Sequence, residues 1–198
     1  VQEWVDLAIG YLDTSLYPED RLTMALDGSL IPNFFNQVQL AESCADISCT
    51  CLGNEIKGID KNVTIRDVLA TYVYDNTLVV LEVYRKHLKL ALERCASYFD
   101  TSEGEIKISD EFLKPKVIHY EYDYFSNLTY TFDLTKPVGD RVTSIIFKGK
   151  ELDDNLKLSL AMNNYRAAGS GGYDCYKECS KLYESSISIQ DIIINYVE

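Results

Sequence analysis

The segment from Leu160 to Tyr173 holds the residues whose types and spacing are best suited to binding a flat ligand. An apolar run ends there in two amides, Asn163 and Asn164, which are followed by the ring of Tyr165 and a cluster of glycines. An aromatic ring offers a stacking face, amides supply both donors and acceptors, and glycine lets the backbone approach a ligand closely. The same pattern also fits a strand that ends in a tight loop and binds nothing.

A second aromatic, Tyr74, lies in the break between a predicted helix and a predicted strand, and Asn76 follows it two positions later. Binding sites are commonly built at junctions of this kind. Tyr74 and Tyr165 are therefore both predicted at the ends of strands, where two facing rings could hold a planar base between them. The tyrosines at positions 120, 122 and 124 alternate as in a strand, which favours a packing role for them instead.

The chain offers little for catalysis of its own. Neither of its two histidines stands in a cluster with carboxylates, and no serine, threonine or cysteine lies in a recognisable nucleophile motif. The six cysteines include Cys49-x-Cys51 and Cys175-x3-Cys179, spacings that fit no standard zinc pattern, although an even number permits disulfides in an exported protein. We expect no metal or other cofactor in this chain, and we expect the chain alone to be inactive.

Charge and hydropathy narrow the class of partner. A net charge of −12 argues against a polynucleotide, which needs a basic face, but leaves room for a single nucleotide at a local site. No apolar run approaches the roughly 18 residues that indicate a membrane span. Because the chain begins at Val1 and carries no signal-like segment, we expect it to be cut from a longer protein.

The elements that must position these residues predict an α+β fold, a mixed sheet with helices packed against it. Residues 1–26 are expected to be a lead-in from a preceding domain, and residues 27–198 a single domain. Apolar spacing and capping residues predict helices over 34–43, 65–72, 86–99 and 187–197. Strands are predicted over 45–51, 77–84, 117–120, 129–134, 142–148 and 156–162.

Three blocks of the sequence resemble the C-terminal domain of the 5′-nucleotidase family. They run from Thr64 to Val80, from Tyr130 to Ser144 and from Asn163 to Gly169, and their order and spacing match the family from about residue 27 onward. The resemblance implies that the nucleoside lies between Tyr74 and Tyr165 and that Asn76 contacts the base edge. It also implies that Asn163 and Asn164 shape the second wall of the site.

Two departures from the family pattern refine the resemblance. The third block usually continues to an acidic residue, but Gly171 stands at that position. Asn-Asn-Tyr-Arg-Ala followed by glycines is instead similar to the 2′,3′-cyclic-nucleotide 2′-phosphodiesterase/3′-nucleotidase branch. Lys57 stands where an arginine is usual in the loop before the first helix of these blocks, so that a bidentate anion contact becomes a point-charge contact.

The resemblance implies a substrate-recognition domain of an exported phosphoesterase that hydrolyses cyclic nucleotides or nucleoside monophosphates. A metallophosphoesterase domain earlier in the same chain would hold the divalent metals and carry out hydrolysis. Secretion, the periplasm or the cell wall is the expected location. The alternatives are a non-catalytic extracellular binding or adhesion module that kept the fold, and a 5′-nucleotidase/UDP-sugar hydrolase.

Overall fold

The structure is a computed structural model that describes residues 4–102 and 104–198. The strands are β1 (Ala8–Tyr11), β2 (Ile47–Cys51), β3 (Asn62–Thr64), β4 (Thr77–Val83), β5 (Phe99–Asp100), β6 (Lys107–Ile108), β7 (Asp123–Ser126), β8 (Thr129–Phe132), β9 (Val142–Phe147), β10 (Lys150–Glu151), β11 (Leu158–Asn163) and β12 (Lys181–Ser188). The α-helices are α1 (Arg21–Asp27), α2 (Leu30–Ser43), α3 (Ile65–Thr71), α4 (Arg85–Ala96), α5 (Asn164–Ala167) and α6 (Ile189–Val197). Short 3₁₀ helices are η1 (Trp4–Asp6), η2 (Asp110–Phe112), η3 (His119–Glu121) and η4 (Asp174–Glu178).

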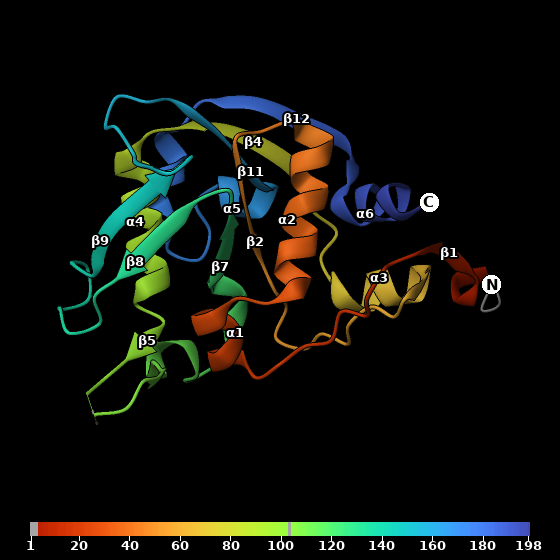
Figure 1. Cartoon of the computed structure of the whole chain (residues 1–198), viewed down its shortest axis with the longest axis horizontal. Helices are drawn as coiled ribbons and strands as arrows, with labels where there is room; N and C mark the ends of the chain where they lie inside the picture. Colours follow the sequence, from red (N-terminus) through yellow and green to blue (C-terminus); the bar gives the residue numbers. More distant parts are fainter. Residues whose placement is uncertain (1–3, 103) are drawn as a thin grey trace.

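A five-stranded mixed sheet with the order β12-β4-β11-β2-β7 forms the centre of the molecule (Figure 1). Only the β11–β2 pairing in this sheet is parallel, and the other three pairings are antiparallel. A separate three-stranded sheet with the order β10-β9-β8 lies beside α4, which β9 contacts (Figure 1). This arrangement confirms the predicted α+β class, with helices packed against a mixed sheet.

Both faces of the central sheet are apolar, because alternate residues of β4 enter different cores. Val79, Leu81 and Val83 pack against one core together with α4. Leu78 and Val80 pack against the other core, which includes residues of α2 and α6. The continuous apolar run of β4 therefore reflects a strand that is covered on both faces.

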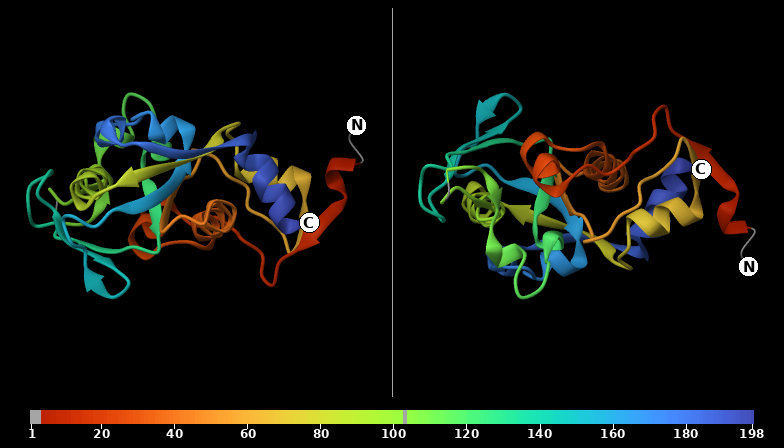
Figure 2. Two further views of the ribbon diagram at one scale, coloured as in Figure 1. Left: turned by 90° about the horizontal axis from the view of Figure 1, so that it is seen from above. Right: turned by 90° about the horizontal axis from the view of Figure 1, so that it is seen from below.

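The segment before α1 is folded onto the domain that it was expected to precede. Strand β1 pairs antiparallel with β3, and an isolated bridge joins Leu16 to Ile59. Leu16 of this segment is buried, as is Met24 in α1 itself. The segment from η1 to β1 and the C-terminal helix α6 consequently lie at the same end of the molecule (Figure 2).

The predicted start of α3 is confirmed in detail. The side chain of Thr64 accepts a hydrogen bond from the backbone N–H of Asp67, and the Asp67 carboxylate accepts one from the backbone N–H of Thr64. This reciprocal capping box satisfies two N–H groups that the helix itself leaves without partners. The short helix therefore has a defined start, and Tyr74 lies in the loop three positions after its last residue, Thr71.

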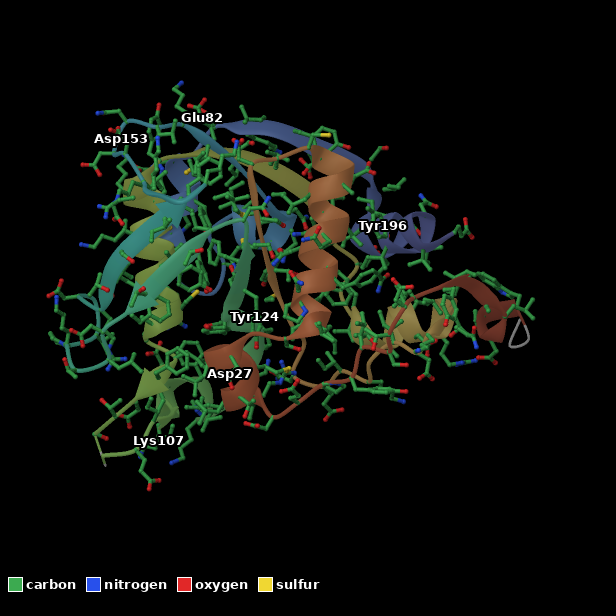
Figure 3. The ribbon with its side chains drawn as sticks, viewed as in Figure 1. Asp27, Glu82, Lys107, Tyr124, Asp153 and Tyr196 are labelled. Atoms are coloured by element: carbon green, nitrogen blue, oxygen red, sulfur yellow. The ribbon has the colours of Figure 1, made fainter. Side chains whose placement is uncertain are left out.

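The strand predicted over residues 117–120 is wrong, because η3 begins at His119. The Tyr98 hydroxyl and His119 Nδ1 lie 2.7 Å apart in a hydrogen bond. The backbone oxygen of Tyr120 accepts a hydrogen bond from Arg166 Nη2 at 2.8 Å. This backbone group is therefore satisfied by a side chain and not by the backbone of a neighbouring strand. Regular strand structure begins only at β7, where Tyr124 lies close to α1 and the start of α2 (Figure 3).

Candidate functional site

Four neighbouring strands begin or finish at the same end of the central sheet. Asn163 at the end of β11 lies opposite Leu78 near the start of β4, because these two strands are antiparallel. Strand β2 finishes at the same end of the sheet because it is parallel to β11, and Cys51 there pairs with Asp123 at the start of β7. Loops that are far apart in the sequence therefore meet at this end of the sheet.

A cavity of about 480 Å³, a size suited to a small-molecule ligand, opens at this end of the sheet. Its lining comes from the strand ends and from the loops that precede or follow them. The lining residues are Cys51, Tyr74, Asn76, Lys116, Tyr120, Glu121, Asn163, Tyr165, Arg166, Ser170 and Gly171. Four residues predicted from the sequence, Tyr74, Asn76, Asn163 and Tyr165, are thus brought together around one space.

The two predicted rings differ in how firmly the fold holds them. Tyr165 is 66% exposed on α5, so most of its ring is free to take up a ligand. Tyr74 is half-buried, and its ring meets that of Tyr120 edge to face with centroids 6.4 Å apart. Burial raises the pKa of the Tyr74 hydroxyl to about 12, so this group is a protonated hydrogen-bond donor at neutral pH.

The two adjacent asparagines have separate surroundings. Asn163 is 4% exposed and caps α5, because its side-chain oxygen accepts from the backbone N–H of Arg166 at 2.7 Å. Asn164 is exposed and lines a different cavity of about 430 Å³, which also contacts β4 and β12. Helix α5 thus separates the two amides, and a ligand contact by Asn164 stays a prediction.

Lys57 is exposed and does not belong to the cavity lining given above. Gly53 in the same loop lies close to the site, because an added Cβ there would lie 3.8 Å from the Tyr74 hydroxyl. Arg21 donates to the backbone oxygens of Gly53 and Asn54, which fixes the start of this loop. An anion contact by Lys57 therefore stays a prediction and would lie outside the described cavity.

Arg166 holds the walls of the cavity together. Its guanidinium forms a two-point ion pair with Asp123, through Nε to Oδ2 at 2.8 Å and through Nη2 to Oδ1 at 3.0 Å. It also donates to the backbone oxygens of Tyr120 and Ser170 at 2.8 and 2.6 Å, and it stacks 4.1 Å from the Tyr173 ring centroid. One buried side chain thereby ties α5 to η3, to β7 and to the glycine loop.

Burial disfavours the charged forms of both Asp123 and Arg166, and each group counters this effect on the other. Burial raises the pKa of the Asp123 carboxyl, and the adjacent guanidinium opposes that rise. Burial is the largest single influence on Arg166 and would lower its pKa, but the charge and hydrogen bonds of Asp123 together with other neighbours outweigh it, so that the pKa lies well above its ordinary value. The two-point geometry keeps both groups charged, because each supplies the counter-charge that water supplies elsewhere.

The absence of an acid at position 171 follows from the place of Arg166. Gly171 has φ +77°, and an added Cβ would lie 2.4 Å from Arg166 Nη1. Arg94 Nε donates to the Gly171 oxygen at 2.8 Å, which holds the loop against this guanidinium. A side chain at position 171 would therefore have to displace a buried arginine whose carboxylate partner, Asp123, comes from another strand.

Replacing Gly171 with aspartate is expected to lower the free energy of unfolding by about 1–3 kcal/mol, as overpacking of a filled site does. The matched control is Gly139→Asp. Gly139 has φ +95°, but an added Cβ there meets nothing within 4 Å, so that variant carries the backbone strain without the clash. Urea unfolding of both variants separates the two effects. Equal losses would mean that Arg166 does not occupy this space.

Several residues of the cavity were not identified from the sequence. Arg166 belongs to the same motif as Tyr165, so its position pointed to the site although its role did not. Lys116, Tyr120 and Glu121 lie in or beside the segment that was wrongly predicted as a strand. Cys51 ends a strand that was correctly predicted, but only the sheet order places its thiol at the cavity, where burial raises its pKa to about 11.

A larger cavity of about 820 Å³ lies between the α1–α2 corner and strands β7 and β8. Its lining contains many aromatic residues, and its charged members are the acids Glu19 and Asp27. It contains none of the predicted binding residues, so the smaller cavity at the strand ends is the candidate site. Within residues 4–102 and 104–198, no group of three or more His, Cys, Asp or Glu is placed to hold a metal ion.

All six cysteines are free thiols in the structure. No helix in the described part of the chain has the length and apolar character needed to cross a bilayer.

Comparisons with known proteins agree with this fold. Residues 8–178 match the family described as 5′-nucleotidase, C-terminal domain. A Staphylococcus aureus structure, assigned as a 5′-nucleotidase and solved with α-ketoglutarate, has a TM-score of 0.92 and 32% identity over 98% of this chain. A 2′,3′-cyclic-nucleotide 2′-phosphodiesterase/3′-nucleotidase of Haemophilus influenzae is 31% identical over 54% of this chain. The trifunctional nucleotide phosphoesterase protein YfkN of Bacillus subtilis is 23% identical over 69%.

The chain spans only part of each of these proteins. It covers 38% of the Staphylococcus aureus chain, 18% of the Haemophilus influenzae protein and 10% of the Bacillus subtilis protein. The similarity therefore concerns one domain of longer proteins.

Proposed function

The chain belongs to the family of 5′-nucleotidase C-terminal domains, and we propose that it recognises the nucleoside part of the substrate in a longer nucleotide phosphoesterase. One observation carries this proposal. The rings of Tyr74 and Tyr165 and the amide of Asn76 line the same cavity, although Tyr165 lies about 90 positions after the other two in the sequence. Two rings and an amide are the groups that a planar, hydrogen-bonding base requires.

Each residue has a distinct part in this proposal. A base that enters the cavity would cover the exposed ring of Tyr165 and meet Tyr74 on its other face. Asn76 presents both a donor and an acceptor to the base edge. Its position is fixed because its backbone oxygen accepts from the N–H of Ile189 at 2.7 Å. Asn163 acts indirectly, by capping the helix that carries Tyr165.

The parent protein is proposed to act on 2′,3′-cyclic nucleotides or nucleoside monophosphates. Support comes from the Haemophilus influenzae relative and from similarly named proteins of Salmonella typhimurium and Yersinia enterocolitica. The lack of room for an acid at Gly171 favours this branch over the 5′-nucleotidase/UDP-sugar hydrolase alternative. The expected export of the parent protein stays a prediction.

Hydrolysis is proposed to belong to a preceding metallophosphoesterase domain of the same protein. The described residues of this chain do not fit the divalent metals of such an enzyme, because no suitable ligand group is present among them. The contribution of this domain would be to hold the nucleoside so that the phosphate faces the other domain. Positioning of this kind is a large part of enzymatic rate enhancement.

The proposal is tested by titrating the 198-residue chain with adenosine, guanosine, cytidine and uridine while following its amide resonances by NMR. We expect shifts at residues that line the cavity, with dissociation constants on the order of 1 mM or below, because part of the substrate's contacts would come from the missing domain. The same preparation with Mn²⁺ and adenosine monophosphate should release no phosphate. A protein that binds none of the four nucleosides, or that hydrolyses the nucleotide, would contradict the proposal.

A further inference from the structure

Of the three charged residues in the cavity lining, Glu121 and Arg166 each have an ion-pair partner within the protein. Arg166 is paired with Asp123, and Glu121 accepts from Arg94 Nη2 at 2.6 Å. Lys116 is the exception in the lining, because no carboxylate of the described residues lies within ion-pair distance of its ammonium group in the structure. The mouth of the cavity therefore carries one unpaired positive charge in a chain whose net charge is −12.

The position of this charge is defined by the rings of the same wall. The Lys116 ammonium lies 5.8 Å from the centroid of the Tyr120 ring, a distance at which a cation is attracted to the ring face. Tyr120 in turn contacts the ring of Tyr74 edge to face. Its backbone oxygen is held by Arg166. Lys116, Tyr120 and Tyr74 thus form a continuous row that ends at one of the two rings of the base site.

We propose that Lys116 is a specificity-determining residue, which makes this site bind anionic nucleotides more tightly than uncharged nucleosides. The inference rests on the proposed function, since it requires a base between Tyr74 and Tyr165. A ligand whose base occupied the cavity would bring its sugar and phosphate toward the mouth, and Lys116 is the charged lining residue there that has no ion-pair partner among the described residues. Elsewhere the acidic chain repels a phosphate, so the local charge decides the preference.

Binding of adenosine and of adenosine monophosphate to the wild type, Lys116→Met and Lys89→Met tests this role. Lys89 is an exposed lysine of α4 outside the cavity lining, so its replacement removes the same charge without touching the site. We expect Lys116→Met to lower the nucleotide-to-nucleoside affinity ratio by about two- to fivefold, the range for an exposed charge pair. Lys116→Met should weaken the binding of adenosine monophosphate more than that of adenosine, and the ratio should stay at the wild-type value in Lys89→Met.

Two further measurements make the result decisive. Lys116→Arg should keep the wild-type ratio, and added salt should reduce the ratio in the wild type more than in Lys116→Met. An equal ratio in Lys116→Met and Lys89→Met would overturn the inference while leaving the base site intact. So would a wild type that binds both ligands equally. A wild type that binds neither ligand would overturn the proposed function, and the role of Lys116 with it.

Discussion

Replacing Asp123 with alanine is expected to lower the free energy of unfolding by about 3–5 kcal/mol, the cost of removing one partner from a buried ion pair. The side chains of Arg166 and Asp123 are only 4% and 1% exposed. The alanine variant would leave the guanidinium buried without its counter-charge and would loosen its hold on the backbone oxygens of Tyr120 and Ser170. Urea unfolding, with the slope compared between variants, measures the loss.

A matched exposed pair provides the control. Lys114 and Asp110 lie 2.9 Å apart with side chains that are 73% and 70% exposed. Asp110→Ala should therefore cost no more than about 1 kcal/mol. The double variant Asp123→Leu, Arg166→Met should recover part of the loss, because it leaves no unpaired charge in the core. If Asp123→Ala unfolds at the same urea concentration as Asp110→Ala, the pair does not hold the site.

Changing Tyr165 to alanine is expected to weaken nucleoside binding by about 1–3 kcal/mol, or about 5- to 150-fold, and Tyr74→Ala should have a similar effect. Each substitution removes one face on which the base would stack. Tyr→Phe at either position should cost less, because the ring remains and only the hydroxyl is lost. The NMR titration with adenosine gives the dissociation constants, and KM of the full-length enzyme provides the same comparison.

The two variants should differ in their effect on folding. Tyr165 is mostly exposed, so its loss should leave unfolding unchanged, whereas Tyr74→Ala also removes the contact with Tyr120. Tyr196, which is 51% exposed on α6 and is labelled in Figure 3, supplies the control substitution to alanine away from the cavity. A double variant of Tyr74 and Tyr165 that binds adenosine as tightly as the wild type would rule out the two-ring site.

Elements whose stability is local were determined by the sequence alone. The capping box of α3 requires only residues three positions apart, and β4 is a run of β-branched and apolar side chains. Strand β12 was not predicted, because it lacks such a local signal: most of its residues are exposed and show no apolar alternation. Its formation depends on pairing with β4, a strand about 100 positions earlier in the chain.

The two rings of the candidate site could be chosen from the sequence because each stands beside an amide at the end of a strand, within a motif shared with a family. Only the tertiary structure decided that they line the same cavity, since this depends on the antiparallel register of β4 and β11. It also placed Asn164 at another cavity and brought Lys116 and Tyr120 to the site. The physical reason is that a pattern of neighbouring residues determines only the contacts between residues that are close in the sequence. The partners of Arg166 lie some 40 positions away, and only the packed fold brings them together.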